Sequence, residues 1–288
     1  MSQAVYQQLR EFSVDGSDLS DYDLDITVKN PKKDPASFEV SVFNMPPGPY
    51  NAVTSGDTPC AITLGWKDGP SSQVMAGQIN ETNRNYSGSD VEYMFKGINA
   101  SEALLKKRIS GTFEEADPGG IAGRLAAEVG LSPQVQNAGE KLVSYNVKDD
   151  KTVRHYLNQL LDYCEQITGQ AWRWEAQEGK LFFQPDTLTP ETVPKLSYDG
   201  LLVDASIKKK GKNDFQRVGF TAMCDPRMKL GAQVKMATEQ ISGNYEVESY
   251  TYFSDSKSGD HFVEGQLKVG SPPSSASDGR TDGYSPQA

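Results

Sequence analysis

Residues 153 to 183 read VRHYLNQLLDYCEQITGQAWRWEAQEGKLFF, and the hydrophobic period of this stretch changes near its middle. Apolar residues first recur at offsets 0, 3, 4, 7, 8, 11 and 14 from Val153, which is the spacing of one face of an α-helix. After Gly169, apolar residues alternate instead in 172–174 and 181–183, on either side of a glycine turn, as in a β-hairpin. The stretch therefore predicts a helix followed by a hairpin, which is a small α+β unit.

A shorter helix is predicted just before this stretch. Asp117-Pro118 has the form of an N-cap followed by proline at the first helical position. Apolar residues then recur every four positions, at Ile121, Leu125 and Val129. Gly130 suits the position after a helix end, so we expect a helix over 118–129. For the helix that starts at Val153, we expect Asp149 or Asp150 to be the N-cap.

Alternating apolar residues predict β-strands on both sides of this α+β unit. Before it they mark 24–28, 38–42, 61–66, 73–81 and 90–98; after it they mark 201–208, 215–223, 233–236, 245–253 and 261–269. An internal echo links the two sets: Gly77 leads to Phe95-Lys-Gly97, and Gly243 leads to Phe262-Val-Glu-Gly265, with Gly-to-Phe spacings of 18 and 19. We interpret the echo as a duplication.

The predicted fold class is mainly β with an α+β insert, in which two related β-barrel domains flank a small helix-plus-hairpin domain. The expected domains are a first barrel at 1–110, the insert at 111–197, a second barrel at 198–270 and an extended C-terminal tail at 271–288. The tail has almost no apolar content, so we expect it to be ordered only against a partner.

Composition and charge exclude several classes of protein. Only 36% of the 288 residues are hydrophobic, which is low for one large globule and suits a subunit covered in an assembly. The net charge of −10, from 39 acidic and 29 basic residues, disfavours tight binding of DNA or RNA. The one basic run, Lys208-Lys-Lys-Gly-Lys212, is expected at a solvated hairpin tip, with a phosphate or partner contact as the alternative.

Signals for export and membrane insertion are not found in the sequence. The N-terminal residues MSQAVYQQLREFSV contain neither a basic nor an apolar signal region. No apolar run approaches the roughly 20 residues of a membrane helix. Cys60, Cys164 and Cys224 are odd in number and far apart, so we expect buried free thiols in a reducing compartment.

Catalytic and metal-binding patterns are also missing, so we predict no catalytic, cofactor-binding or metal-binding residues. His155 lies off the apolar helix face and is expected to be partly exposed, and His261 is expected to form a polar pair with Asp260 at a strand edge. Neither histidine has zinc ligands at close spacing. The acidic cluster Asp15, Asp18, Asp21, Asp23 and Asp25 does not match a calcium loop and is expected to be a solvated surface. The sequence has no nucleophile elbow, phosphate-binding loop or dinucleotide motif.

Trp172 and Trp174 lie two residues apart on a predicted strand and so share a face. We expect them to pack on the adjacent helix or on a neighbouring subunit, with a sugar-stacking platform as the alternative. A carboxylate pair of the glycosidase type has no sequence signature, so a hydrolase is a further alternative. We interpret residues 153–183 as a core rather than an active site.

The order of these elements resembles the baseplate hub proteins of contractile-tailed phages, also called late-control or tail-hub proteins, and the N-terminal region of type VI secretion spike proteins. The resemblance is carried by three groups of segments: Phe38–Asn44, Ala61–Trp66 and Met75–Ile79 in the first barrel; Ile121–Leu131, the helix from Val153 and Gly179–Phe183 in the insert; and Ser242–Val247 with Asp260-His-Phe262 in the second barrel.

The resemblance implies a structural protein of the virion tail baseplate, made in the host cytoplasm, that is not an enzyme and needs no cofactor. Such hubs carry two related barrels in a chain and form a homotrimer, so that six similar units match the six-fold tail tube above while three-fold symmetry suits the spike below. The implied partners are a tail tube or tube-initiator protein, the central spike and other baseplate proteins, the last through the C-terminal tail. DNA would pass the channel without specific binding. The alternative is a carbohydrate- or receptor-binding β-rich tail protein.

Overall fold

The structure is a computed structural model that describes residues 7–31, 35–53, 58–170, 172–177, 179–185, 195–198, 200–208 and 217–269. The elements before the insert are β1 (Gln8–Val14), β2 (Ser17–Asp18), β3 (Asp23–Asn30), β4 (Ser37–Phe43), α1 (Pro47–Asn51), β5 (Thr58–Trp66), β6 (Ser71–Ser87) and β7 (Asp90–Asn99). Those after it are β13 (Lys195–Leu196), β14 (Leu202–Lys208), β15 (Arg217–Met223), β16 (Gln233–Ala237), β17 (Ser242–Asp255) and β18 (His261–Val269). The predicted C-terminal tail, 271–288, lies outside the described residues.

The strands on the two sides of the insert repeat one pairing order. In the first β unit, β3 pairs with β4, β4 with β7, β7 with β6 and β6 with β5. In the second, β14 pairs with β15, β15 with β18, β18 with β17 and β17 with β16. All these pairs are antiparallel, and the strands follow one another in the same chain order. The two units therefore match strand for strand, as the duplication inferred from the sequence requires.

Each unit has a glycine directly opposite a phenylalanine. Gly97 of β7 pairs with Phe38 of β4, and Gly265 of β18 pairs with Phe220 of β15. A Cβ atom on Gly97 would lie 2.6 Å from Cε1 of Phe38, and one on Gly265 would lie 2.9 Å from Cε1 of Phe220. A backbone carbonyl oxygen of the neighbouring strand blocks the same space in both cases. The ring covers the glycine, so neither position has room for a side chain.

The residues that occupy equivalent positions in the two β units differ from those predicted by the repeat in the sequence. Counted from the two matched glycines, Phe95 corresponds to Val263, so the prediction that it matches Phe262 is wrong. The spacing from Gly77 and Gly243 misleads because these two glycines are not equivalent. Gly77 lies opposite Asn99, two residues after Gly97, and so corresponds to Val247, which lies opposite Leu267, two residues after Gly265.

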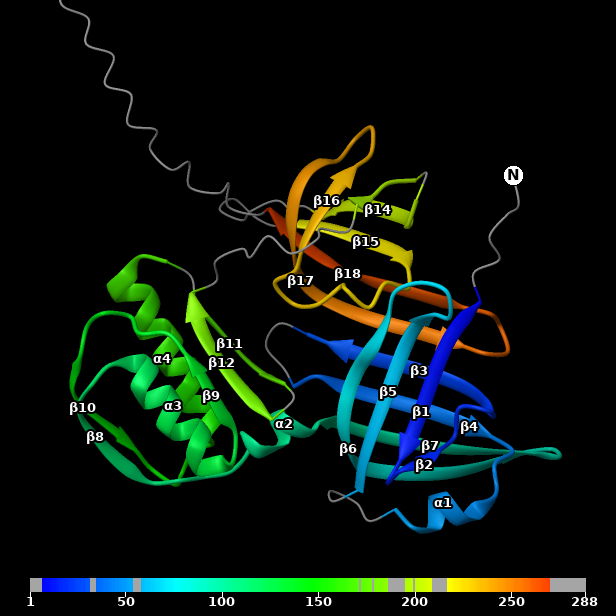
Figure 1. Cartoon of the computed structure of the whole chain (residues 1–288), viewed down its shortest axis with the longest axis horizontal. Coiled ribbons are helices and arrows are strands. Elements are labelled where there is room, and N and C mark those ends of the chain that lie inside the picture. The colour runs from blue at the N-terminus through cyan, green and yellow to red at the C-terminus, as the bar shows by residue number, and fades with distance from the viewer. Residues whose placement is uncertain are drawn as a thin grey trace, which may run out of the picture.

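Pairing of β3 with β17 joins the two units into one sheet. Residues 25–30 of β3 lie antiparallel to residues 250–255 of β17, with Val28 opposite Tyr252. The strand order of the sheet is β14-β15-β18-β17-β3-β4-β7-β6-β5-β1-β2, with β16 on β17 and β13 on β16. Figure 1 shows the second unit above the first and the insert to one side.

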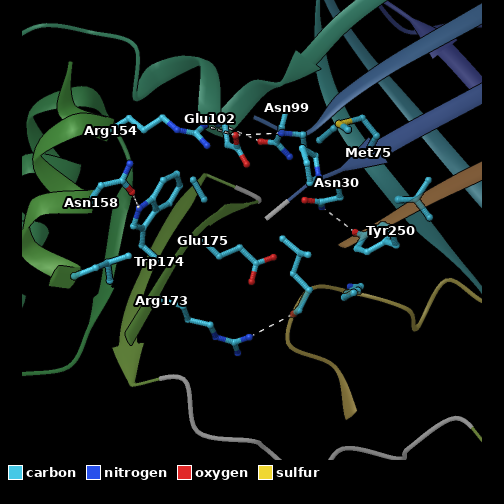
Figure 2. Close-up of a pocket in the computed structure, with 18 of the residues that line it drawn as sticks. Asn30, Met75, Asn99, Glu102, Arg154, Asn158, Arg173, Trp174, Glu175 and Tyr250 are labelled. Atoms are coloured by element: carbon cyan, nitrogen blue, oxygen red, sulfur yellow. Dashed lines mark hydrogen bonds and ion pairs between the residues drawn. The ribbon is translucent and has the colours of Figure 1, made fainter. Parts of the chain in front are cut away.

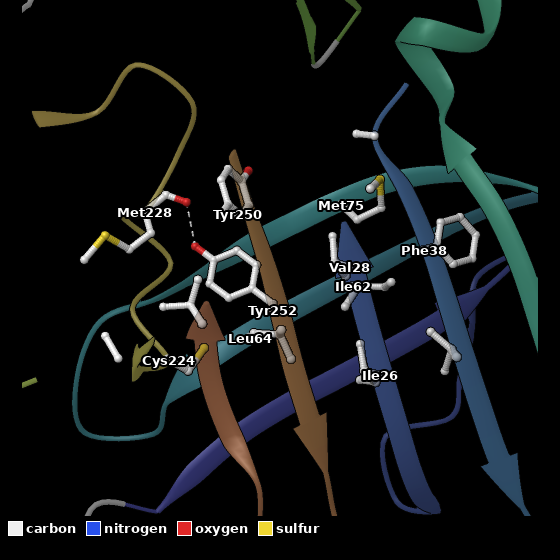
Figure 3. Close-up of a cluster of buried hydrophobic side chains, with 14 of the residues drawn as sticks. Ile26, Val28, Phe38, Ile62, Leu64, Met75, Cys224, Met228, Tyr250 and Tyr252 are labelled. Atoms are coloured by element: carbon white, nitrogen blue, oxygen red, sulfur yellow. Dashed lines mark hydrogen bonds between the residues drawn. The ribbon is translucent and has the colours of Figure 1, made fainter. Parts of the chain in front are cut away.

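One hydrophobic cluster fills the space inside the curled sheet. It contains buried side chains from β1, from β3 to β7 and from β13 to β18, so both units contribute to the same core. Figure 3 shows Tyr252 with Val28 and Leu64 of the first unit. The Tyr252 hydroxyl lies 2.9 Å from the carbonyl oxygens of both Asp225 and Met228, and its single proton can be donated to either, which satisfies a buried polar group.

The insert is a separate small α+β layer with its own core. Its elements are α2 (Ala100–Leu104), β8 (Gly111–Ala116), α3 (Pro118–Val129), β9 (Ser132–Val135), β10 (Leu142–Val147), α4 (Val153–Thr168), β11 (Trp172–Gln177) and β12 (Lys180–Pro185). β12 pairs antiparallel with β11 and parallel with β9, and β8 pairs with β10. The two longer helices, α3 and α4, pack on each other and on the three-stranded sheet. The predicted fold class, mainly β with a small helical insert, is confirmed.

Helix α3 has the predicted bounds, but one predicted cap is wrong. Asp117 accepts a hydrogen bond from the Gly120 amide, and Gly130 ends the helix with a φ of 94°. Gly169 likewise ends α4 with a φ of 67°, a region that favours glycine. The N-cap of α4 is Thr152, which accepts from the His155 amide, rather than Asp149 or Asp150. The strands that were not predicted from the sequence are β1, β8, β9, β10 and the two-residue strands β2 and β13.

We expect Gly97→Ala and Gly265→Ala each to lower the free energy of unfolding by about 1–3 kcal/mol, because the new methyl group overpacks a filled site. Denaturant unfolding measures this change. Gly48→Ala is the matched control, since nothing lies within 4 Å of a Cβ at that position. A loss in the control as large as in the two variants would contradict the role given to these glycines.

Candidate functional site

A cavity of about 490 Å³ lies where the insert meets both β units. Its walls come from β3, β6 and the start of α2 on one side, from α4 and β11 on another, and from residues 226–230 and β17 on the third. Figure 2 shows Glu102, Arg154, Trp174, Glu175 and Tyr250 around it. Residues of the insert and of both β units line it together, so we treat it as the candidate site.

Glu102 is held in the first turn of α2 by the helix cap. The Asn99 side chain accepts hydrogen bonds from the amides of Ser101 and Glu102, at 2.9 and 3.2 Å. One carboxylate oxygen of Glu102 then accepts from Arg154 of α4 at 3.0 Å and from the Ala36 amide at 3.2 Å. Burial raises the pKa of the Glu102 carboxyl, and Arg154 opposes that rise. This group ties the insert to the first unit.

Arg173 and Glu175 link the insert to the second unit. They lie on the face of β11 opposite to Trp172 and Ala176, whose side chains enter the insert core. Arg173 donates to the carbonyl oxygen of Leu230 at 3.4 Å. Burial raises the pKa of Glu175, while the charges of Arg173 and Lys229 lower it.

The two tryptophans pack on α4, as predicted. Trp172 is 5% exposed, and its indole nitrogen donates to Thr168 at 3.0 Å. Trp174 donates to Asn158 at 2.8 Å, and the Arg154 guanidinium lies 5.0 Å from its ring centre. A paired stacking platform is therefore wrong, because the Trp172 ring is buried in the insert.

The helix and hairpin of residues 153–183 are a core, as the sequence analysis concluded. The buried side chains of this stretch are Val153, Tyr156, Leu157, Leu160, Cys164, Trp172, Ala176, Leu181 and Phe183. Among the polar residues of this stretch that line the cavity, Arg154 bonds to Glu102 and Asn158 to Trp174. This arrangement suits a structural junction. Sequence reasoning missed Glu102, Arg173 and Glu175, because their partners lie on other elements far away in the chain.

His261 lies in a second polar junction, and the prediction that it sits at a strand edge is wrong. It is 5% exposed, and its ring meets Trp66 edge-on at 4.9 Å. Nε2 lies 2.8 Å from the Gly65 carbonyl oxygen, and Nδ1 lies 2.8 Å from Ser254 Oγ. Arg10 donates to that same hydroxyl oxygen at 3.0 Å. A neutral ring that donates from Nε2 and accepts at Nδ1 satisfies every one of these contacts.

The remaining candidate residues have the predicted surroundings. His155 and the five clustered aspartates are exposed. The three cysteines are buried, and burial raises each thiol pKa to about 12. In the basic run, Lys208 ends β14 and residues 209–212 lie outside the described residues.

Metal and membrane signals were searched in the same described ranges. These residues contain no group of three or more His, Cys, Asp or Glu side chains placed to hold a metal ion. Nor does any described helix have the length and apolar character needed to cross a membrane.

We expect Arg154→Met to destabilise the protein by about 1–3 kcal/mol, because it leaves the Glu102 carboxylate, 12% exposed, without its charged partner. Adding Glu102→Gln should recover part of that loss in a double-mutant cycle followed by chemical unfolding. Lys96→Met is the control: it breaks an ion pair with Glu39 whose side chains are 38% and 46% exposed, so a loss of under about 1 kcal/mol is expected. Equal losses in the two single variants would contradict the structural role of the Glu102 pair.

Burial lowers the pKa of His261 from 6.5 to about 4, and this shift makes stability depend on pH. Between these values the unfolded chain binds the proton more readily, so stability is lost as pH falls from about 6.5 to 4. The loss is about 3 kcal/mol at most, at 1.36 kcal/mol for each pKa unit.

His261→Gln removes this titration, so its stability deficit against the natural sequence should shrink as pH falls over that window. Urea unfolding at several pH values measures the deficit, with the exposed His155→Gln as control. A deficit for His261→Gln that stays constant from pH 7 to 4 would refute the assignment.

Neither a protein-family model nor a curated protein matches the sequence. Solved structures do match. The tail protein from Neisseria meningitidis MC58 has a TM-score of 0.70 at 13% identity, over 91% of this chain and 97% of that one. The 43 kDa tail protein of prophage MuSo2 from Shewanella oneidensis has a TM-score of 0.70 at 10% identity, over 91% and 98%.

A type VI secretion protein shares the fold as well. The Escherichia coli c3393 protein, a component of that system with structural similarity to the T4 tail proteins gp27 and gp5, has a TM-score of 0.64 at 9% identity, over 90% of this chain and 77% of that one. The chain thus has the fold of phage tail proteins and of a type VI secretion component, which confirms the resemblance drawn from its sequence at the level of the fold.

Proposed function

We propose that this chain is a structural baseplate hub of a phage tail or of a related contractile injection machine. In this proposal it is made in the host cytoplasm and assembled into the tail baseplate. Three copies form a ring that adapts a six-fold tail tube to a three-fold spike. The observation that carries the proposal is the strand-for-strand match of the two β units in one chain.

The similarity of the two β units allows a trimer to satisfy both six-fold and three-fold symmetry. A six-fold tube presents six equal binding surfaces, whereas three identical chains present three. If each chain carries two similar β units, a trimer presents six of them while keeping true three-fold symmetry for the spike. We propose that the insert runs from α2 (Ala100–Leu104) to β12 (Lys180–Pro185), between these units and outside the repeated part, rather than over 111–197. Leu105 packs in the insert core, and Leu196 packs in the core shared by the two units.

The proposed partners follow from this position. A tail tube or tube-initiator protein would bind one face of the ring and the central spike the other, while residues 271–288 would contact other baseplate proteins. The ring would line the channel for DNA. The net charge of −10 supports passage of DNA without specific binding, since like charges repel.

A non-enzymatic role is supported by the contacts in the cavity. Glu102 bonds to Arg154 and to a backbone amide, and Glu175 lies among the positive charges of Arg173 and Lys229. Carboxylates held by such partners serve as structural links. The matching tail proteins have the same overall fold.

The alternative, a carbohydrate- or receptor-binding tail protein, is less well supported. It was based on Trp172 and Trp174 as a sugar-stacking platform, and Trp172 is 5% exposed. Both tryptophans line the cavity, but only Trp174 lies outside the insert core with part of its ring exposed. Glycan binding that is lost in Trp174→Ala and kept in the exposed Tyr198→Ala would favour this alternative.

Native mass measurement of the full chain, alone and with its spike and tube partners, tests the hub proposal. We expect a homotrimer that binds one trimeric spike. A chain that stays monomeric under all these conditions, or a ring with a number of copies other than three, would contradict it.

A further inference from the structure

The pairing of residues 250–255 of β17 with β3 is called the internal joint. Two other strand edges correspond to its two sides in the repeated units, and neither has a strand beside it in the described part of the chain. The counterpart of β17 is β6, whose first part pairs with β5 up to Ile79, while residues 81–87 pair only with β7. The counterpart of β3 is β14, which pairs only with β15.

Side chains at the internal joint are more buried than those at the corresponding positions of β6 and β14, as expected if β6 and β14 lack a neighbouring strand. In the internal joint, Tyr252 and Val28 are each 1% exposed. At the matched positions, Thr82 is half-buried on β6 and Ala205 is half-buried on β14, and most of their neighbours are exposed. The same arrangement of strands therefore occurs twice: its edges are paired at the internal joint, and they are unpaired in β6 and β14.

Exposed apolar side chains gather on the open edges. Six large apolar side chains of the described residues are exposed, and three of them lie here: Tyr86 on β6 at 67%, Val203 on β14 at 57% and Ile207 on β14 at 42%. Long open strand edges with apolar side chains are usually avoided, because they template pairing with other chains. Here they occur at the two places where the duplication calls for a partner.

We propose that β6 of one copy of this chain pairs with β14 of the next, so that the joint inside each chain is repeated between chains. The partner is a second copy because it alone supplies the matching strand in each direction. The two edges belong to different units: in Figure 1 the β6–β7 hairpin extends past the lower unit, and β14 lies at the far end of the upper one. A contact between two different surfaces is head-to-tail and closes into a ring when the rotation permits.

The internal joint also fixes the register of the proposed contact. The matched glycines align Thr82 with Tyr252 and Asn83 with Phe253. They align Ala205 with Val28 and Asp204 with Thr27. Since Tyr252 lies opposite Val28 and Phe253 opposite Thr27, Thr82 should lie opposite Ala205 of the next copy, and Asn83 opposite Asp204 of the next copy.

This inference rests on the proposed hub function, and disulfide trapping tests it. Two full-length variants carry Thr82→Cys with Ala205→Cys, and Asn83→Cys with Asp204→Cys. Neighbouring opposed pairs alternate between Cα separations of about 4.5 and 5.5 Å, within the range that a disulfide spans. The three natural cysteines are buried and give little background.

Two further variants are matched controls. Thr27→Cys with Phe253→Cys places the same pair at the internal joint and should form a disulfide within one chain. Ser87→Cys with Asp204→Cys shifts the register by four residues, or roughly 13 Å, and should form none.

We expect oxidation of the two in-register variants to give covalent multimers that a reductant dissolves, and the shifted pair to give none. Assembled protein without these multimers, or with equal trapping of the shifted pair, overturns the strand-pairing proposal and leaves the hub function standing. Protein that is also monomeric by native mass overturns both.

Discussion

The backbone pairing of β3 with β17 is the interaction on which the rest of the structure depends. It brings the start of the chain against its end, since residues 25–30 pair with residues 250–255. Because of it, two matched β units form one sheet around one core rather than two independent bodies. The buried side chains Val28 and Tyr252 meet across this joint, and the second polar junction, His261 with Ser254 and Arg10, lies beside it. The joint therefore sets the angle between the units, and any ring built from them inherits that angle.

The insert is a separately packed layer that is attached to the side of the two β units. Its core is closed by its own helices and hairpin, and it touches the β units through polar groups. Glu102 fixes it to the first unit and Arg173 to the second, so that the cavity between them is a junction with charged walls. No strand of the insert pairs with the main sheet in the described part of the chain, so no β-ladder joins the two.

The period of the hydrophobic pattern predicted most of the elements. Helices α3 and α4 stood out because caps and a continuous apolar face mark them. Strands β8 and β10 form a two-stranded sheet with few buried residues, so they lack the alternation that reveals a strand. The duplication was visible only as a weak repeat, and its residue register was wrong because Gly77 corresponds to Val247 rather than to Gly243. His261 was misplaced, and Glu102 and Glu175 were missed, because each depends on partners from distant strands that local sequence cannot reveal.

An electron-microscope reconstruction of the assembled protein, bound to its tube and spike neighbours, is the most direct test of this account. The account predicts three chains in a ring of six similar β units. Every joint between units would be an antiparallel strand pair, β17 with β3 inside a chain alternating with β6 and β14 between chains. A ring in which neighbouring chains meet through the insert, or in which the two β units of a chain occupy unrelated environments, would contradict it.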